Sequence, residues 1–263
     1  DNDGTLWVEQ PLYTQGFFVI DEIRRLAAEH PEWSHEEPFA AVLSGDISRL
    51  ATLSEHDVAV LLAATHAGMT TTAFADAARV WLETARHPRF DRVFTQCVYQ
   101  PQLELLSFLR ANGFTVFIVS GGGVDFLRQF AEETYGIPPH QVIGSSVQAS
   151  FSIVDGEPVL TKEAVVGSID DQAGKPINIH LHIGRQPILA FGNSDGDLPM
   201  LQYTDAGSGP RLALIVHHDD AAREYAYDRS SAVGCLDAAW DEALARGWTV
   251  VSMKRDWRTV FAE

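Results

Sequence analysis

The chain has 263 residues, of which 46% are hydrophobic and 21% are charged, and it contains two cysteines. This composition excludes intrinsically disordered, collagen-like and disulfide-scaffold proteins, and the length suits two domains or one domain with an insertion. The 19 Lys and Arg residues against 36 Asp and Glu residues give a formal net charge of −17. Because this charge repels phosphate backbones and anionic lipids, we expect neither nucleic acid nor a membrane as a partner. A small anionic ligand would need local donors or a metal cation.

The opening segment, Asp1–Leu6, places two carboxylates two residues apart, at Asp1 and Asp3, followed by Gly4 and Thr5. In an extended chain, residues i and i+2 share a face. One carboxylate can then attack as a nucleophile while the other supplies and removes a proton. An ordinary turn rich in Asp and Gly is the alternative interpretation.

The first residues of the sequence indicate whether the natural chain begins here. The sequence begins inside this motif, without a Met or a preceding strand, so we expect the natural chain to extend upstream. The sequence has neither an apolar run of about 18 residues nor a signal pattern, which predicts a soluble protein. The compartment, cytoplasm or periplasm, stays open.

Residues 10–99 differ from the rest of the chain because they show no convincing strand pattern. Helical spacing of apolar residues recurs at Gly16–Glu29, Glu55–Ala64 and Thr72–Ala85. We therefore predict a helical cap domain over residues 10–99, inserted into a core domain formed by residues 1–9 and 100–263.

The remainder alternates between strand and helix patterns. Buried parallel strands are predicted at Phe114–Val119, Pro187–Phe191, Leu212–Val216 and Trp248–Met253. Amphipathic helices are predicted at Leu103–Asn112, Val124–Tyr135, Ala221–Asp228 and Leu236–Arg246. This alternation predicts an α/β fold with a Rossmann-like, doubly wound parallel sheet. Alternating residues around Asp155-Gly156 predict a small β-hairpin insertion at Ser146–Thr161.

Two features of the core are suited to binding a phosphate group. The strand ending at Val119 leads into Ser120, Gly121, Gly122 and Gly123 ahead of a helix. Such a turn offers backbone N–H groups, a hydroxyl and a helix N-terminus to an anion, although a plain strand-to-helix turn is the alternative. Lys175 adds a cation in an otherwise acidic chain, although an isolated lysine is usually a surface residue.

A third feature is suited to binding a metal ion. The strand ending at Phe191 is followed by Gly192, Asn193, Asp195 and Asp197. These side chains offer the hard oxygen ligands that Mg²⁺ prefers.

Together and in this order, the four motifs resemble those of the haloacid dehalogenase superfamily of phosphohydrolases, especially its phosphoserine-phosphatase-like branch. The resemblance covers nearly the whole chain, through Asp-x-Asp-x-Thr at Asp1, the strand-terminal Ser120, Lys175 and the segment beginning at Gly192. The helical cap that this family inserts between its first two motifs is similar to residues 10–99.

The resemblance implies a Mg²⁺-dependent hydrolysis of small phosphomonoesters through an aspartyl-phosphate. Asp1 would be the nucleophile, Asp3 the general acid and base, and Ser120 and Lys175 would hold the phosphoryl oxygens. The metal would lie between the Asp1 carboxylate, the Asp3 backbone carbonyl, Asn193 and Asp197, with Asp197 orienting metal-bound water. Thr5 would orient the motif loop, and the backbone of Gly121 and Gly122 would contact the phosphoryl group. The oligomeric state stays open.

The sequence departs from the family pattern at two places. Asn193 stands where the family has a metal-binding Asp, so Asp195 is an alternative ligand. Gln10 stands where the phosphoserine enzymes place a Glu, with Glu9 one residue earlier, so phosphoserine itself is not predicted as the substrate. Glu9 and Gln10 are nevertheless predicted to contact substrate.

Trp7 and Tyr13 are additional candidates for substrate contact, whereas His217-His218-Asp219-Asp220 is interpreted as structural because adjacent side chains point to different sides. A dehalogenase is disfavoured because a departing halide needs no proton from Asp3. A phosphomutase and a non-catalytic phospholigand-binding protein remain alternatives.

Overall fold

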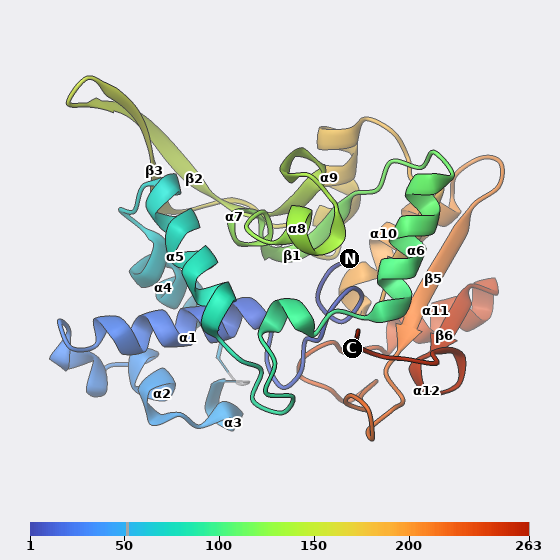
Figure 1. The fold of residues 1–263 in the computed structure, drawn as a ribbon, viewed down its shortest axis with the longest axis horizontal. Coiled ribbons are helices and arrows are strands. Elements are labelled where there is room, and N and C mark those ends of the chain that lie inside the picture. The colour runs from blue at the N-terminus through green and yellow to red at the C-terminus, as the bar shows by residue number, and fades with distance from the viewer. Residues whose placement is uncertain (51–52, 263) are drawn as a thin grey trace.

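The computed structural model describes residues 1–50 and 53–262. Within this part of the chain the strands form two three-stranded sheets (Figure 1). The first sheet contains β1 (Ile118–Gly123), β2 (Val142–Val154) and β3 (Glu157–Ser168). The second contains β4 (Leu189–Gly192), β5 (Leu212–His217) and β6 (Thr249–Ser252). β1 pairs in parallel with the start of β2, and β4, β5 and β6 pair in parallel in that order.

Helices alternate with these strands, as the sequence predicts. They are α6 (Gln100–Ala111), α7 (Val124–Leu127), α8 (Ala131–Tyr135), α9 (Gly174–Ile183), α10 (Leu198–Asp205), α11 (Ala238–Arg246) and α12 (Met253–Asp256). Short 3-10 helices are η1 (Pro31–Ser34), η2 (Phe94–Gln96), η3 (Pro139–Gln141) and η4 (Asp195–Asp197). Val119 and Ile143 of the first sheet share one buried cluster with Ala190 and Ile215 of the second. The predicted α/β fold with parallel, Rossmann-like sheets is therefore confirmed.

One predicted helix is wrong. Residues 221–228 form turns and a short bridge instead of a helix. The Asp220 carboxylate accepts the backbone N–H groups of Ala222 and Arg223, and Arg223 then reaches the carbonyl oxygens of Met253 and Trp257. These side-chain contacts compete with helical backbone bonding and hold the segment against α12.

The segment between the first motif and α6 is helical, and its described residues contain no strand. Its helices are α1 (Thr14–Leu26), α2 (Phe39–Ser44), α3 (Ile47–Leu50), α4 (Glu55–His66) and α5 (Thr71–Thr84). α4 begins with a capping box formed by Ser54 and Asp57, and α5 begins where the Thr70 hydroxyl accepts the Ala73 N–H. These local caps satisfy backbone donors that the first helical turn leaves free.

The helical segment packs directly on the α/β part of the molecule. Phe18 of α1 stacks on Phe126 of α7 with ring centroids 5.4 Å apart, and Trp81 of α5 lies 6.1 Å from the same ring. All three side chains belong to one buried cluster that also contains Trp7 and Ile118. The division into a cap at residues 10–99 and a core therefore stays a prediction, with a continuous apolar cluster across the proposed boundary.

The predicted hairpin is present and is longer than expected. β2 and β3 pair antiparallel around Asp155 and Gly156, whose φ values are 52° and 87°. Positive φ at both central residues is the geometry that an Asp-Gly turn favours. The hairpin projects from the body of the molecule beside α4 and α5 (Figure 1). At its base, the Lys162 N–H donates to Met69 O at 2.8 Å and Gly68 N–H donates to Lys162 O at 2.9 Å.

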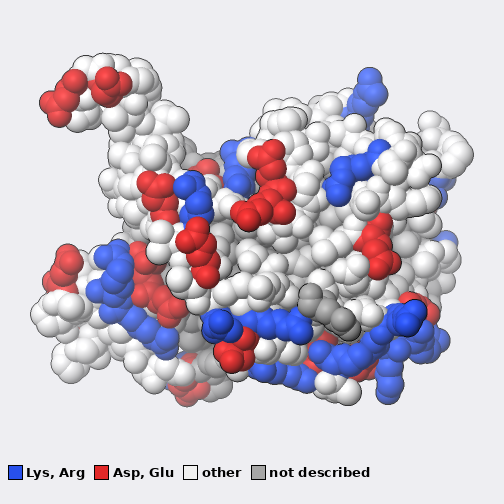
Figure 2. Space-filling model, viewed as in Figure 1, with Lys and Arg blue, Asp and Glu red and all other residues white. Residues whose placement is uncertain are grey.

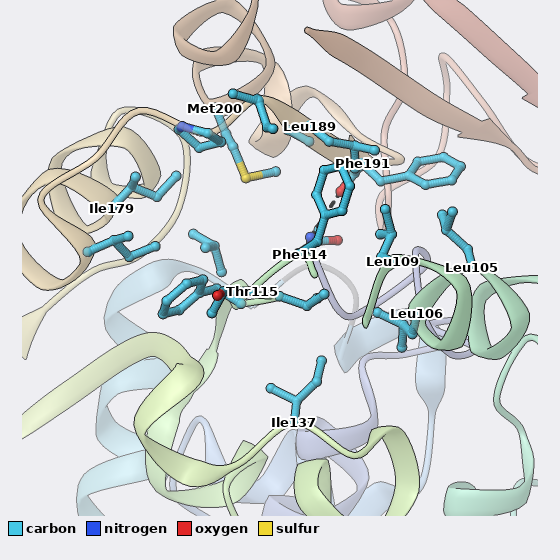
Figure 3. A pocket seen from close by; sticks show the side chains of 18 of the residues that line it. Leu105, Leu106, Leu109, Phe114, Thr115, Ile137, Ile179, Leu189, Phe191 and Met200 are labelled. Atoms are coloured by element: carbon cyan, nitrogen blue, oxygen red, sulfur yellow. Dashed lines mark hydrogen bonds between the residues drawn. The ribbon is translucent and has the colours of Figure 1, made fainter. Parts of the chain in front are cut away.

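A largely apolar cavity of about 650 Å³ lies between β1 and β4. Leu105, Leu106 and Leu109 of α6 point into it opposite Ile179 and Met200 (Figure 3). Its described lining includes Asp1 and Thr5 but not Asp3, Ser120 or Lys175. Among the candidate catalytic groups, the cavity thus adjoins Asp1 but not Asp3, Ser120 or Lys175.

Among the helices within residues 1–50 and 53–262, none combines the length and the apolar character needed to span a bilayer.

Candidate active site

The first motif forms a tight turn. The carbonyl oxygen of Asn2 accepts the N–H groups of Thr5 at 3.1 Å and Leu6 at 2.8 Å. Gly4 has a φ of 70°, and a Cβ there would lie 2.1 Å from Asn193 Nδ2, so only glycine fits this position. At Gly4 the backbone of this turn therefore packs closely against Asn193, in the segment that follows β4.

Asp1 is held from both sides. Its Oδ1 accepts a hydrogen bond from Lys175 Nζ at 2.8 Å, and its Oδ2 lies 3.1 Å from Thr5 Oγ1. The Asp1 side chain is 8% exposed and that of Lys175 is 2% exposed. The two groups form a nearly buried ion pair that fixes the orientation of the candidate nucleophile.

Lys175 lies on α9, and its ammonium group has three partners. Besides Asp1, Nζ donates to Asp197 Oδ1 at 2.6 Å and to Val119 O at 3.0 Å. Since an ammonium group has three protons, these acceptors use all of them. In this arrangement two carboxylates share the single positive charge of Lys175, and a bound phosphoryl group would have to share one of its donors.

Asp3 has a different environment from Asp1. Its Oδ1 accepts the indole N–H of Trp7 at 2.8 Å. Burial raises the pKa of Asp3 above its ordinary value, although the indole bond and the Lys175 charge act in the opposite direction. A raised pKa favours the protonated form that a general acid needs.

The last residues of β1, Ser120–Gly123, pair irregularly with β2 and are called the Ser120 loop; they lie beside Asp3. Ser120 is buried and its Oγ accepts the Gly122 N–H at 3.1 Å. A Cβ at Gly122 would lie 3.6 Å from Asp3 Oδ2, which places this part of the loop against the candidate acid. The Gly123 N–H donates to Gln15 Oε1 of α1 at 2.7 Å. Gly121 faces a different neighbour, because a Cβ there would lie 3.7 Å from the Asp171 side chain.

The acidic segment after β4 places its three side chains differently. Asn193 is buried, and its Oδ1 lies 3.1 Å from Thr5 Oγ1. Asp197 Oδ2 accepts the backbone N–H groups of Asn193 at 2.9 Å and Ser194 at 3.1 Å. Burial alone would raise the pKa of Asp197, but the Lys175 ammonium brings that pKa below its ordinary value. Asp195 instead accepts the backbone N–H groups of Asp237, Ala238 and Ala239 at the start of α11.

The residues present fit a magnesium ion. Asp1 Oδ2, a carboxylate oxygen, and Asn193 Oδ1, an amide oxygen, each lie 3.1 Å from the Thr5 hydroxyl, so two oxygen donors of the kind that Mg²⁺ prefers lie near each other. Mg²⁺ typically binds through one or two carboxylates and retains several waters. Within the described residues there is no cluster of three or more His, Cys, Asp or Glu side chains placed to hold a metal.

The four predicted substrate-contact residues have their own partners. Glu9 is 2% exposed, and its Oε1 accepts from Asn193 Nδ2 at 2.7 Å and from the Tyr227 hydroxyl at 2.8 Å. Burial raises the pKa of Glu9 to about 8. Gln10 donates to Val233 O at 2.9 Å. Trp7 is buried and gives its N–H to Asp3, whereas Tyr13 is 43% exposed.

His218, which the sequence indicated only as part of a structural segment, contacts the first motif. Its Nε2 lies 2.7 Å from Gly4 O, and its Nδ1 lies 3.1 Å from Glu224 Oε2. Both His218 and Glu224 are buried, and the imidazole stacks on Tyr227 with ring centroids 4.4 Å apart. The only signal in the sequence was the position of His218 just after a strand, at the edge where ligands bind in open α/β sheets.

Comparison with solved structures places this architecture among known folds. A protein of unknown function from Bordetella pertussis Tohama I is 14% identical, with 95% of each chain covered and a TM-score of 0.56. A functionally unknown protein from Anaerococcus prevotii DSM 20548 is 19% identical over 72% of this chain and 50% of that chain, with a TM-score of 0.46. A phosphoserine phosphohydrolase-like protein from Francisella tularensis subsp. tularensis SCHU S4 is 16% identical over 82% of this chain and 84% of that chain, with a TM-score of 0.40. The first similarity concerns the fold alone, and the two looser superpositions carry no argument.

A search of curated protein sequences finds no significant match. A protein family does match: the haloacid dehalogenase-like hydrolase family aligns with residues 1–202, which include the first motif, the Ser120 loop, Lys175 and the segment after β4. The chain therefore belongs to the haloacid dehalogenase-like hydrolases.

Proposed function

We propose that this hydrolase is a Mg²⁺-dependent phosphomonoesterase that acts on a small phosphorylated metabolite through an aspartyl-phosphate. The observation that carries the proposal is the contrast between two carboxyl groups in one turn. Asp1 is paired with the Lys175 ammonium, whereas burial raises the pKa of Asp3. Environments that separate two carboxyl groups in this way assign one to ionic chemistry and the other to proton donation.

In the first step, an Asp1 carboxylate oxygen attacks phosphorus and the bond from phosphorus to the ester oxygen breaks. Asp3 gives its proton to the leaving oxygen, which departs as an alcohol. The Trp7 indole N–H holds the Asp3 carboxyl group in place, and Lys175 keeps Asp1 oriented for in-line attack. The N–H groups and hydroxyl of the Ser120 loop would contact the phosphoryl oxygens.

In the second step, the Asp3 carboxylate takes a proton from water, and the resulting hydroxide attacks phosphorus. The bond between phosphorus and the Asp1 oxygen breaks, which restores the Asp1 carboxylate and releases inorganic phosphate. Asp3 thus acts first as the general acid and then as the general base.

The Asp1 carboxylate, the Asp3 backbone carbonyl and Asn193 Oδ1 would hold Mg²⁺. When bound, the ion supplies positive charge that offsets the charge of the phosphoryl group during transfer. Asp197 acts on this site through its partners, because its two oxygens are engaged by Lys175 and by the backbone of Asn193 and Ser194.

The first test is phosphate release from p-nitrophenyl phosphate and a panel of small phosphoesters, with Mg²⁺ and with EDTA. We expect turnover that requires the metal and falls by at least about 1,000-fold in Asp1→Asn, because a neutral amide is a poor nucleophile. Folded wild-type protein that binds Mg²⁺ yet releases no phosphate from any ester would contradict the proposal and favour a ligand-binding role.

A further inference from the structure

Glu9 and Asn193 form a buried contact that links the first motif to the segment after β4. Asn193 Nδ2 donates to Glu9 Oε1 at 2.7 Å. The same Glu9 oxygen accepts the Tyr227 hydroxyl at 2.8 Å. Glu9 is 2% exposed and Asn193 is 1% exposed, so water does not replace either partner readily.

This contact decides which end of the Asn193 amide faces Asp1. Glu9 Oε1 accepts from Asn193 and from the Tyr227 hydroxyl, so the end of the Asn193 amide that faces Glu9 is the donor, Nδ2. The amide oxygen then points the other way, to a position 3.1 Å from Thr5 Oγ1. Thr5 Oγ1 is itself 3.1 Å from Asp1 Oδ2. The amide oxygen, which can bind a cation, is thereby directed to the side of the nucleophile.

The contact between Glu9 and Asn193 is closely enclosed by backbone. A Cβ at Gly4 would lie 2.1 Å from Asn193 Nδ2 and 2.4 Å from Glu9 Oε1, and a Cβ at Gly234 would lie 1.9 Å from the same Glu9 oxygen. Two glycines therefore enclose the contact on the Glu9 side. An aspartate at position 193 would place one acceptor against another, because its second oxygen would occupy the Nδ2 position facing Glu9 Oε1.

We propose that Glu9 is a positioning residue that orients the Asn193 amide with its oxygen toward the Mg²⁺ site. This inference rests on the metal site of the proposed function. It differs from the sequence prediction, in which Glu9 contacts substrate. It also explains how a neutral side chain serves at this position: an amide has two unlike ends, and Glu9 selects the end that binds a cation.

The test compares the Asn193 amide, whose two ends differ, with the carboxylate of Asn193→Asp, whose two oxygens are equivalent. Glu9→Met removes the acceptor and frees the Asn193 amide to rotate, so we expect Mg²⁺ affinity to fall at least about tenfold. Glu9→Gln retains an oxygen acceptor, so its affinity should stay within about threefold of wild type. Adding Asn193→Asp to Glu9→Met should restore the affinity, because either oxygen of a carboxylate can face the ion. Glu104→Met, the same substitution at an exposed site on α6, is the control.

Mg²⁺ affinity is measured by titration calorimetry with MgCl₂ alone, after circular dichroism has shown that each variant is folded. Wild-type affinity in Glu9→Met, or a double variant as weak as Glu9→Met, would overturn the inference, as would wild-type protein that does not bind Mg²⁺. Because the readout is metal binding, wild-type protein that binds Mg²⁺ without turnover would contradict the proposed function alone.

A second measurement does not depend on the folding of Glu9→Met. In wild-type protein, the side-chain NH₂ resonance of Asn193 can be identified by its loss in Asn193→Asp. We expect its protons to exchange slowly with solvent, both with and without Mg²⁺, because Glu9 accepts one of them. Rapid exchange would show that the amide is not held by Glu9 and would overturn the inference.

Discussion

At the scale of single residues, Lys175 is the cation that offsets the negative charge of two nearly buried carboxylates in the site. It lies 2.8 Å from Asp1 and 2.6 Å from Asp197, and all three side chains are at most 8% exposed. Two buried carboxylates without a nearby cation would repel each other and would have lost their hydration. The lysine therefore stabilises the folded site and also orients Asp1, the proposed nucleophile.

We expect Lys175→Met to lower the free energy of unfolding by about 3–5 kcal/mol, as is usual when one partner of a buried ion pair is removed. Turnover should fall by more than about 100-fold, because Asp1 loses its orienting partner. Urea denaturation and phosphate release measure the two effects. Lys254→Met, at an exposed lysine of α12, is the matched control, and equal behaviour of the two variants would refute this account.

His218 acts one step further from the reaction. It holds the carbonyl group of Gly4, and Gly4 follows Asp3 directly in the chain. We expect His218→Phe to keep the stacking on Tyr227 but to lower kcat by about 10- to 100-fold, because small displacements of catalytic groups are costly. KM should change less than kcat.

The variant His218→Gln separates positioning from packing. Its side-chain amide can still donate to Gly4 O, so kcat should recover in part relative to His218→Phe. Steady-state kinetics of both variants, with thermal unfolding as a check on the fold, test this prediction. Identical losses in the two variants would indicate that His218 serves packing alone.

At the scale of elements, the base of the hairpin joins the helical segment to the α/β part. Lys162 of β3 pairs with Asp125 of α7 and lies 4.6 Å from the ring centroid of Phe74 of α5. Its backbone also bonds to the turn between α4 and α5. One buried lysine thus contacts two helices and a turn. β2 begins before the predicted segment because its first residues pair in parallel with β1.

His66, at the end of α4, makes this junction sensitive to pH. Burial, followed by the Lys162 charge, lowers the pKa of His66 to about 4 from its ordinary value of 6.5. Between about pH 6.5 and pH 4, His66 therefore binds a proton in the unfolded chain but not in the folded chain. The contribution of neutral His66 to the free energy of unfolding is fully present above this range and is lost as the pH falls through it.

The full loss corresponds to about 3 kcal/mol. We expect His66→Gln to show a smaller decrease in stability than wild type between pH 7 and pH 4.5. Urea denaturation at several pH values measures the difference between the two proteins. Parallel curves for wild type and His66→Gln over this range would contradict the prediction.

At the scale of the whole molecule, charged side chains are distributed unevenly over the surface (Figure 2). Figure 2 shows acidic side chains at the tip of the hairpin and over the helical segment, with Lys and Arg gathered along the lower edge. The sum is a formal charge of −17. A dianionic ester approaches against this field, and the cation in the site, Lys175, is buried between two carboxylates.

Added salt should therefore favour substrate binding. We expect kcat/KM for a dianionic ester to rise severalfold between about 20 and 200 mM KCl at constant Mg²⁺, because ions screen the long-range repulsion. Phosphocholine carries its own positive charge and should show a smaller rise. A constant or falling kcat/KM for the dianionic ester would mean that local donors dominate its approach.

The elements and the motifs were largely predictable from the sequence because both depend on local patterns. Apolar runs indicated β4, β5 and β6, and Asp155-Gly156 indicated the hairpin turn. The first predicted strand, Phe114–Val119, overlaps β1 only from Ile118 onward, and the helix predicted at Val124–Tyr135 is divided into α7 and α8. The predicted helix at residues 221–228 was wrong because its competitors are the Asp220 side chain and the distant carbonyl groups of Met253 and Trp257. Local periodicity contains no information about such partners.

By itself, the sequence determined the fold class and the family, through the order and spacing of four short motifs. Only the tertiary structure decided how those motifs meet: which three acceptors surround Lys175, that Asp195 caps α11, and that Glu9 faces Asn193 across 184 positions of sequence. The physical reason is that strands and turns follow from neighbouring residues. Hydrogen-bond partners, burial and pKa values instead depend on which distant side chains the packed core brings within a few ångströms.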